Sequence, residues 1–371
     1  MGLWCCTSSG ADAGLVTGLF PPQERDWGLP SEAELSPRAA ARVGREAATQ
    51  TFDPGARAIN IDWSTNLDGK QIERWSEALG QSLVDRRRQE LEAFEQHGEL
   101  PPCKENEHEL LVIGMDGGRV QTREKSEETG SRWKEDKVLT ISSCLKGDGS
   151  EAHPPKKLLT TTLATMQDSR MFGRLARLEA ERRGIRNARE VILIGDGGNW
   201  IDPICEEHFA CHQRIIDYYH AAEHLHEVAK AARPSNDKAA AKLAEQLVGL
   251  LWNGRIEALL RRLDKLSDEA GPPRPGDPEN HPRQVLAENA GYFQRHRQHM
   301  DYPAYRSRGW PIGSGIIESG VKRFGKRVKG TEQFWSIEGV EAILALRSKW
   351  LSEDEESQHY WLGLPPRKLA A

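Results

Sequence analysis

Two aspartates stand in the same local pattern, directly after a run of apolar residues and directly before two glycines. Leu110–Gly118 has the sequence LLVIGMDGG and Val191–Gly198 has VILIGDGG, which place Asp116 and Asp196 at corresponding positions. A short apolar run bounded by glycine predicts a buried strand. Small neighbours also let a bulky, highly charged ligand approach the backbone. If the two strands lie side by side, their carboxylates come together.

A third carboxylate follows much later, in Gly309–Gly330, GWPIGSGIIESGVKRFGKRVKG. Ile317, Val321 and Phe324 recur at helical spacing and predict a helix with Glu318 in its first turn. The same segment carries a basic cluster without an internal acid. The residues that we expect to contact a polyanion are Arg308, Lys322, Arg323, Lys326, Arg327 and Lys329.

Three carboxylates of this kind suit a hard divalent cation, because Mg²⁺ and Mn²⁺ take oxygen ligands and keep water for a phosphate to displace. Two such ions, about 3.5 to 4 Å apart, stabilise the attacking and leaving oxygens of an in-line phosphoryl displacement. A basic helix nearby would hold a phosphate backbone. The residues therefore predict two-metal nuclease-type chemistry.

Length and composition limit the alternatives. The chain has 371 residues, enough for two or three domains, and a formal net charge of −5, so any basic surface must be local. No run of about 18 apolar residues appears, and the opening MGLWCCTSSG lacks the features of a signal peptide. Six scattered cysteines do not predict a disulfide framework. We expect a cytoplasmic protein, associated with the nucleoid, without a membrane partner.

The pattern changes several times along the chain. Residues 1–30 show no clear periodicity, residues 31–100 are helical, and residues 105–233 alternate strands and helices as a mixed α/β core does. Residues 234–305 predict an all-helical insertion, 306–350 return to the core, and 351–371 form a tail. In the first helical part Ser36 is a predicted N-cap, and residues 65–69 form a turn between two helices. A helix-turn-helix module and a helical hairpin that packs on the core both fit this part.

Within the core, strands are predicted for Leu110–Met115, Val138–Leu145, Leu158–Met166 and Arg214–Ile216, besides the strand before Asp196. Residues 119–128 are interpreted as a charged connection.

The segments LLVIGMDGGRV, VILIGDGGNWI, IIDYYHAAEHL and GWPIGSGIIESGVKRFGKRVKG resemble the core of bacterial insertion-sequence DDE transposases of the ISKra type, relatives of the Mutator-like group. The resemblance covers about residues 105 to 350. It implies a ribonuclease-H-like fold with strand order 3-2-1-4-5, a helical insertion before the glutamate, and Asp116, Asp196 and Glu318 as catalytic, metal-binding residues. Asp217 and His220 would match a motif that organises the site.

The resemblance further implies cleavage of transposon-end DNA and strand transfer into target DNA, with two Mg²⁺ or Mn²⁺ ions. The partner would be double-stranded DNA, bound by a homodimer or a higher oligomer. The helical part would be the DNA-binding segment. Related chains usually begin with a longer cysteine-bearing region, whereas this chain has only Cys5 and Cys6 there.

Two other functions remain open at this point. His220, Glu223 and His224 fit the H-x-x-E-H pattern of inverzincin zinc hydrolases. A transposase remnant that binds DNA without cleaving it would also keep these motifs. The glycines around Asp196 do not complete a dinucleotide-binding fingerprint, because Trp200 stands where the third glycine belongs. Trp310 and Trp335 are expected to pack in the core rather than stack on bases.

Overall fold

The computed structural model describes residues 35–100, 108–127, 129–150, 152–313, 315–330 and 333–363. Its centre is a five-stranded mixed sheet with the order β3-β2-β1-β4-β5. The strands are β1 (His108–Gln121), β2 (Trp133–Leu145), β3 (Lys156–Thr165), β4 (Ala188–Gly195) and β5 (Gln213–Ile216). β1 pairs antiparallel with β2 and parallel with β4. The predicted α/β class and the predicted strand order 3-2-1-4-5 are confirmed.

The first strand is longer than the sequence predicted. Its pairing with β2 continues past Asp116, from Asp116↔Val138 to Gln121↔Trp133, so the expected end at Met115 and the charged connection from residue 119 are wrong. Gly117 and Gly118 do not end the strand. Instead, a Cβ at either glycine would touch the carboxylate of a residue on β2, so both leave room across the hairpin. β1 and β2 therefore extend as a two-stranded ribbon beyond the edge of β4.

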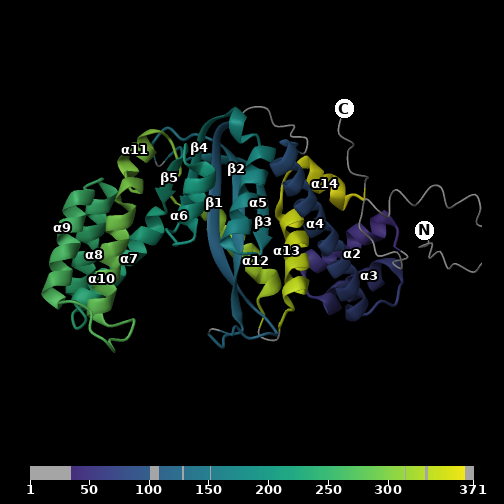
Figure 1. The fold of residues 1–371 in the computed structure, drawn as a ribbon, viewed down its shortest axis with the longest axis horizontal. Helices are drawn as coiled ribbons and strands as arrows, with labels where there is room; N and C mark the ends of the chain where they lie inside the picture. Colours follow the sequence, from purple (N-terminus) through teal and green to yellow (C-terminus); the bar gives the residue numbers. More distant parts are fainter. Residues whose placement is uncertain are drawn as a thin grey trace, which may run out of the picture.

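Helices cover both faces of the sheet. Consecutive residues of the central strands are buried, so both faces carry side chains that must be covered. On one face α5 (Ser169–Arg182) and α6 (Ile201–Phe209) pack against Leu111, Ile113 and Leu139. On the other face, α12 (Gly315–Val328) and α13 (Ile337–Leu351) pack near β1 to β3. The end of the molecule beyond β5 is a helical block of α7 (Tyr218–Ala232), α8 (Asp237–Trp252), α9 (Ile256–Ala270) and α10 (Pro282–His296) (Figure 1).

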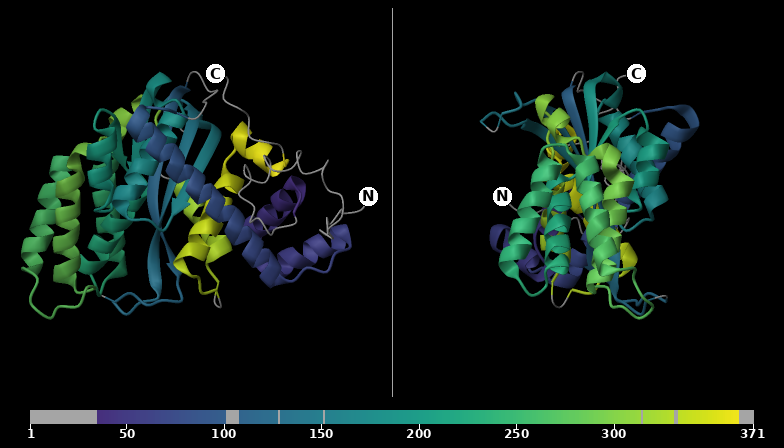
Figure 2. Two further views of the ribbon diagram at one scale, coloured as in Figure 1. Left: turned by 45° about the vertical axis from the view of Figure 1, so that its right-hand side comes forward. Right: turned by 90° about the vertical axis from the view of Figure 1, so that its left-hand side faces the viewer.

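The opposite end is formed by α2 (Pro37–Thr49), α3 (Phe52–Trp63) and the start of α4 (Gly69–His97). Ser36 caps α2 as predicted, and Asp68 and Gln71 form a capping box on α4. α4 then runs diagonally from these helices to the sheet (Figure 2). The α2–α4 helices share one apolar core with α12 and α13. Their role in DNA binding stays a prediction, and residues 1–34, with Cys5 and Cys6, lie outside the described residues.

Within the described ranges, no helix is both long enough and apolar enough to cross a membrane. After α10 the chain passes through α11 (Tyr302–Ser307) and returns to the sheet, and after α13 it ends in α14 (Glu355–Trp361).

Helix α13 and the turn that follows it cover the edge of the sheet. The outward N–H groups of β3 and the residue after it point away from β2, and each donates to a side chain from this segment. The pairs are Thr160 to Glu353 (2.8 Å), Thr162 to Ser352 (2.9 Å), Ala164 to Ser348 (2.9 Å) and Met166 to Glu341 (2.6 Å). Edge strands expose unpaired backbone groups that invite aggregation. Here α13 and the turn after it satisfy these groups.

The Ser348→Ala variant should therefore lose about 1 to 3 kcal/mol of unfolding free energy, because it leaves the buried N–H of Ala164 without its acceptor. Urea denaturation of the whole chain measures this. The control is Ser307→Ala, which removes an exposed helical hydroxyl and should change stability little. Equal stabilities of the two variants would contradict the edge-covering role of α13.

Candidate functional site

Asp116 and Asp196 are brought together by the parallel pairing of β1 with β4. The pairing ends at Gly114↔Ile194, and each aspartate lies two residues further along its own strand direction. Neighbouring strands are about 4.8 Å apart, and residues two apart lie on the same face. The predicted meeting of these two segments is therefore observed in the backbone.

The electrostatics of Asp116 report the same proximity. Burial, and then the negative charges of Asp196 and Glu318, raise the pKa of its carboxyl group to about 6. The N–H of Gly117, which donates to Asp116 at 2.6 Å, and the nearby His220 act against this increase. Three predicted site residues, Asp196, Glu318 and His220, thus act on one carboxyl group from three distant segments.

Two glycines allow α12 to bring Glu318 to this face of the sheet. A Cβ on Gly114 would lie 2.8 Å from Thr140 Oγ1 and 3.0 Å from Ile317, and one on Gly320 would lie 3.1 Å from Thr140. Ordinary side chains at these positions would push the helix outward. The first turn of α12, which contains Glu318, is held against β1 at this point.

Asp217 fixes the start of α7. It is almost fully buried, and its carboxylate accepts hydrogen bonds from the N–H groups of Tyr219 (2.6 Å) and His220 (3.1 Å). The N–H of Asp217 donates to the carbonyl of Gly195 and that of Tyr218 to the carbonyl of Ile312. The end of β4, the first turn of α7 and the loop before α12 are therefore joined by backbone hydrogen bonds.

As the side chains lie, the described part of the chain contains no group of three His, Cys, Asp or Glu placed to hold a metal ion. Glu318 is turned toward Lys322, with 3.2 Å between Oε2 and Nζ, and its side chain is 46% exposed. A surface pair of this kind contributes less than about 1 kcal/mol, so the carboxylate turns away from it at little cost. Asp116 and Asp196 fit a divalent cation, because a cation between them would offset the burial and the repulsion that together raise the pKa of Asp116.

Helix α10 of the helical block also reaches the site, which the sequence analysis did not predict. The hydroxyl of Tyr292 donates to the carbonyl of Asp196 at 2.8 Å, and Asn289 lies 2.7 Å from His224. Gly197 has a φ of +89°, and a Cβ there would meet Tyr292 and His296 at about 3 Å. A polar and aromatic face on one helix, at spacing three and four, was the available signal.

The basic cluster divides in the structure. Lys322, Arg323, Lys326 and Lys329 are exposed and line a groove along α12 together with Glu318 and Ser319. Arg308 is exposed but lies elsewhere, stacked 4.8 Å from the Trp310 ring. Trp310 and Trp335 are both buried, as predicted.

The prediction that Arg327 contacts phosphate is wrong, because its side chain is 1% exposed. Its guanidinium donates to the carbonyl of Ala47 and lies between the rings of Phe52 and Trp335. Burial, and then the charge of Arg347, lower its pKa to about 10. The basic residues are close together in the sequence, but the helical period places Arg327 on the buried face of α12 with Phe324 and Val328.

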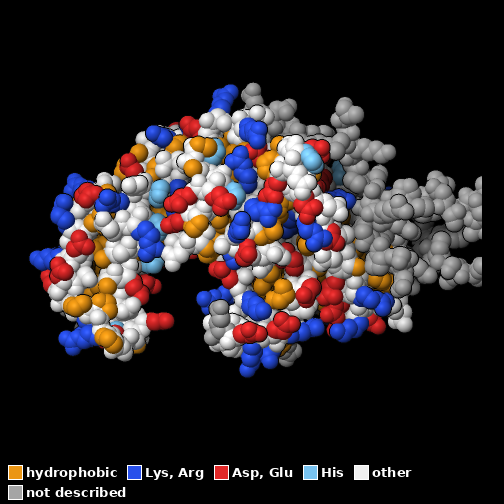
Figure 3. All heavy atoms as spheres, in the orientation of Figure 1, with side chains coloured by type: hydrophobic (Ala, Val, Ile, Leu, Met, Phe, Trp, Pro, Cys, Tyr) orange, Lys and Arg blue, Asp and Glu red, His pale blue; other side chains and the backbone are white. Residues whose placement is uncertain are grey.

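The space-filling view shows a deep hollow between the helical block and the β1–β2 ribbon (Figure 3). Asp116 comes from β1 and His220 from α7, so the two parts that border this hollow both contribute site residues.

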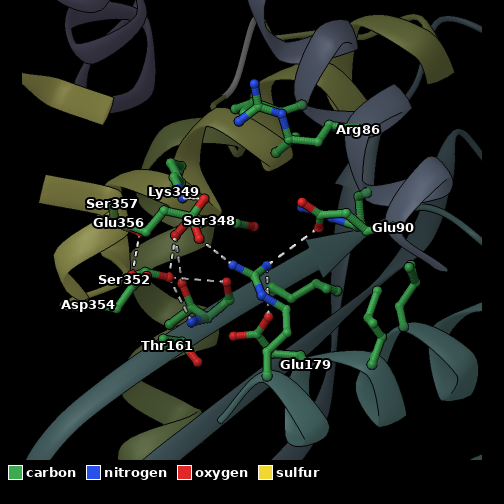
Figure 4. Close-up of a pocket in the computed structure, with 18 residues that line it drawn as sticks. Arg86, Glu90, Thr161, Glu179, Ser348, Lys349, Ser352, Asp354, Glu356 and Ser357 are labelled. Atoms are coloured by element: carbon green, nitrogen blue, oxygen red, sulfur yellow. Dashed lines mark hydrogen bonds and ion pairs between the residues drawn. The ribbon is translucent and has the colours of Figure 1, made fainter. Parts of the chain in front are cut away.

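A second pocket, more enclosed than the groove along α12, lies away from the carboxylates between α4, α5, α13 and α14 (Figure 4). Arg182 lies 3.7 Å from Glu90 and 3.4 Å from Glu179 and donates to Glu356, which also pairs with Lys349 at 2.8 Å. Because these charges pair with one another, we interpret this pocket as a buried link between helices.

The zinc-hydrolase pattern is only partly assembled. The Nε2 atoms of His220 and His224 lie 3.1 Å apart, but the Glu223 side chain is 77% exposed. Cys205, beside His208, is buried, and burial raises its pKa to about 11. The described residues supply no third ligand to either histidine-containing set.

The Asp116→Asn variant should unfold less readily than the natural chain at pH 7.5 without divalent ions, by about 1 to 2 kcal/mol. The pKa of Asp116 is about 6 in the folded chain and 3.8 in the unfolded chain. Between pH 3.8 and pH 6 the folded chain therefore binds more protons at this group than the unfolded chain does. Stability from this group is present at low pH and is lost as the pH rises through 6. The difference between the proteins should therefore shrink from pH 6 to pH 4.

Urea denaturation across this pH range measures the effect, and Asp264→Asn, which changes an exposed aspartate of α9, is the control. An Asp116→Asn protein that is less stable than the natural chain at pH 7.5 would contradict the repulsion between the carboxylates.

Neither a protein-family model nor a curated protein matches this sequence. Among solved structures, the chain is similar to the Drosophila P element transposase strand transfer complex, with a TM-score of 0.35 and 11% sequence identity, over 85% of this chain and 92% of that chain. At this level of similarity, the function has to be argued from the geometry of the site.

Proposed function

We propose that this chain is a DDE transposase of the insertion-sequence type, which cleaves transposon-end DNA and joins it to target DNA with divalent metal ions. The observation that supports this is the convergence of Asp116, Asp196 and Glu318. The first two extend the register of adjacent parallel strands, and both other acids act on the pKa of Asp116. Carboxylates that destabilise one another in a folded protein are characteristic of functional sites.

In this proposal Asp116 and Asp196 hold the metal ions, and Glu318 completes the site after it leaves Lys322. Two bound Mg²⁺ or Mn²⁺ ions would activate a water molecule and stabilise the leaving 3′-oxygen. Asp217 keeps the first turn of α7, and with it His220, beside these carboxylates.

The reaction is two in-line displacements at phosphorus. In the first, water attacks the scissile phosphodiester, the bond to the 3′-oxygen breaks, and a 3′-hydroxyl and a 5′-phosphate form. In the second, this 3′-hydroxyl attacks a phosphodiester of target DNA, so one P–O bond forms as another breaks. Neither displacement requires a covalent bond between protein and DNA.

The groove along α12 fits the DNA backbone. Lys322, Arg323, Lys326 and Lys329 are exposed there, and Gly325 and Ser319 leave the helix surface low between them. Phosphates bound by these residues would pass directly over Glu318. The proposed partner is double-stranded DNA, both transposon ends and target, held by a homodimer or a higher oligomer.

Asp116→Asn, Asp196→Asn and Glu318→Gln should each abolish metal-dependent strand cleavage while leaving the fold intact. Cleavage of DNA carrying the terminal inverted repeats that flank the coding region, with Mg²⁺ or Mn²⁺, measures this, and circular dichroism checks the fold. Glu338→Gln, on α13, is the matched control and should cleave normally. Measurable cleavage by Asp196→Asn would overturn the proposal, and binding without cleavage by the natural chain would indicate a non-catalytic protein.

Replacing Lys322, Lys326 and Lys329 by glutamine should flatten the salt dependence of DNA binding. Each lost phosphate contact removes about 0.9 from the slope of log affinity against log salt concentration, so a decrease of about 2 to 3 is expected. The control replaces Lys238, Lys242 and Lys265, exposed lysines of the helical block, and removes the same charge. An equal slope in the two triple variants would place the DNA elsewhere.

A further inference from the structure

Three side chains at successive turns of α10 reach the carboxylate site from the helical block. Asn289 contacts His224, Tyr292 contacts both His224 and Asp196, and His296 lies beside Gly197. α10 lies between the carboxylate site and the apolar core of the block. Asn289 is 5% exposed, so its polar atoms need partners.

The hydrogen bonds of Asn289 have one consistent direction. Its Nδ2 lies 2.8 Å from the carbonyl oxygen of Val285, which accepts but cannot donate. The amide nitrogen must therefore face Val285, and Oδ1 faces His224 Nδ1 at 2.7 Å. An amide oxygen also cannot donate, so His224 carries its proton on Nδ1.

This assignment determines the proton on the next ring. In neutral His224 the Nε2 atom has a lone pair, and it lies 3.1 Å from Nε2 of His220. The hydrogen bond between the rings therefore requires His220 to carry its proton on Nε2. The Nδ1 atom of His220 is then unprotonated. Asn289 thus determines, through one intervening ring, which nitrogen of His220 is a base.

The ring of His224 is also held in orientation. Tyr292 stacks on it, with 4.4 Å between ring centroids and 27° between planes, while the Tyr292 hydroxyl donates to the Asp196 carbonyl. At the other end, Asp217 fixes the backbone of His220. His220 therefore has a fixed backbone and a fixed tautomer, and it lies near the Asp116 carboxyl group.

We propose that Asn289 and His224 are positioning residues that hold His220 in a single tautomer and ring orientation beside Asp116, so that the helical block is a working part of the carboxylate site. The catalytic consequence rests on the proposed function; the tautomer does not. Residues that hydrogen-bond to a functional side chain orient it, and replacing them lowers activity about 10- to 100-fold.

The first test is spectroscopic and independent of activity. In the full chain labelled with ¹⁵N-histidine, long-range ¹H–¹⁵N correlation spectra at pH 7.5 should show His224 protonated on Nδ1 and His220 on Nε2, assigned with His220→Gln and His224→Gln. In Asn289→Leu, both rings should become tautomer mixtures. Gln284→Leu, the same chemical change on the exposed face of α10, should leave both signals unchanged. His224 protonated on Nε2 in the natural chain would overturn the inference.

The second test separates binding from catalysis. Asn289→Leu should lower the cleavage rate about tenfold or more at saturating DNA while leaving the DNA dissociation constant unchanged. Asn289→Asp, which keeps an acceptor for His224, should recover activity to within about threefold of the natural chain. Normal cleavage by the Asn289→Leu variant would overturn only the catalytic part of this inference. A natural chain that never cleaves overturns the proposed function, and the spectra still decide the tautomer.

Discussion

The parallel pairing of β1 with β4 is the constraint on which the rest of the site depends. It carries two aspartates to the same level on adjacent strands, where burial and like charge both oppose ionisation of Asp116. A protein does not gain stability from such an arrangement, and the surrounding structure has to maintain it. Gly114 and Gly320 let α12 approach the sheet closely at this point, and Gly197 leaves room for Tyr292 and His296 of α10.

The helix that carries Glu318 is anchored to the far end of the molecule by buried cations. Arg327 of α12 and Arg347 of α13 donate to the carbonyls of Ala47 and Ala48 in the last turn of α2. These carbonyls have no partner within their own helix, and the end of the helix dipole favours positive charge. The first helices are therefore not an independent appendage.

The helical block has a comparable link on the other side. Its apolar core packs against β5, and α10 presents a polar face to Asp196 and His224. Residues as distant as Asn289 and His220 thereby belong to one hydrogen-bonded chain. The block therefore contacts the carboxylate site directly through α10, whereas the first helices are linked to it only through α12.

The sequence by itself determined the strands, because Leu110–Met115 and Val191–Ile194 are apolar enough to be buried on both faces, and it marked Asp116, Asp196 and Glu318 by their neighbours. It also predicted the strand order, through a family resemblance. Only the tertiary structure decided that β1 continues past Asp116, since cross-strand pairing with β2 outweighs two local glycines. It also decided that Arg327 is buried while Lys326 beside it is exposed, and that Asn289 reaches His224. The local pattern of a sequence indicates which residues can be buried and which are charged. Which surfaces meet depends on contacts between segments far apart in the chain, and these cannot be predicted from local spacing.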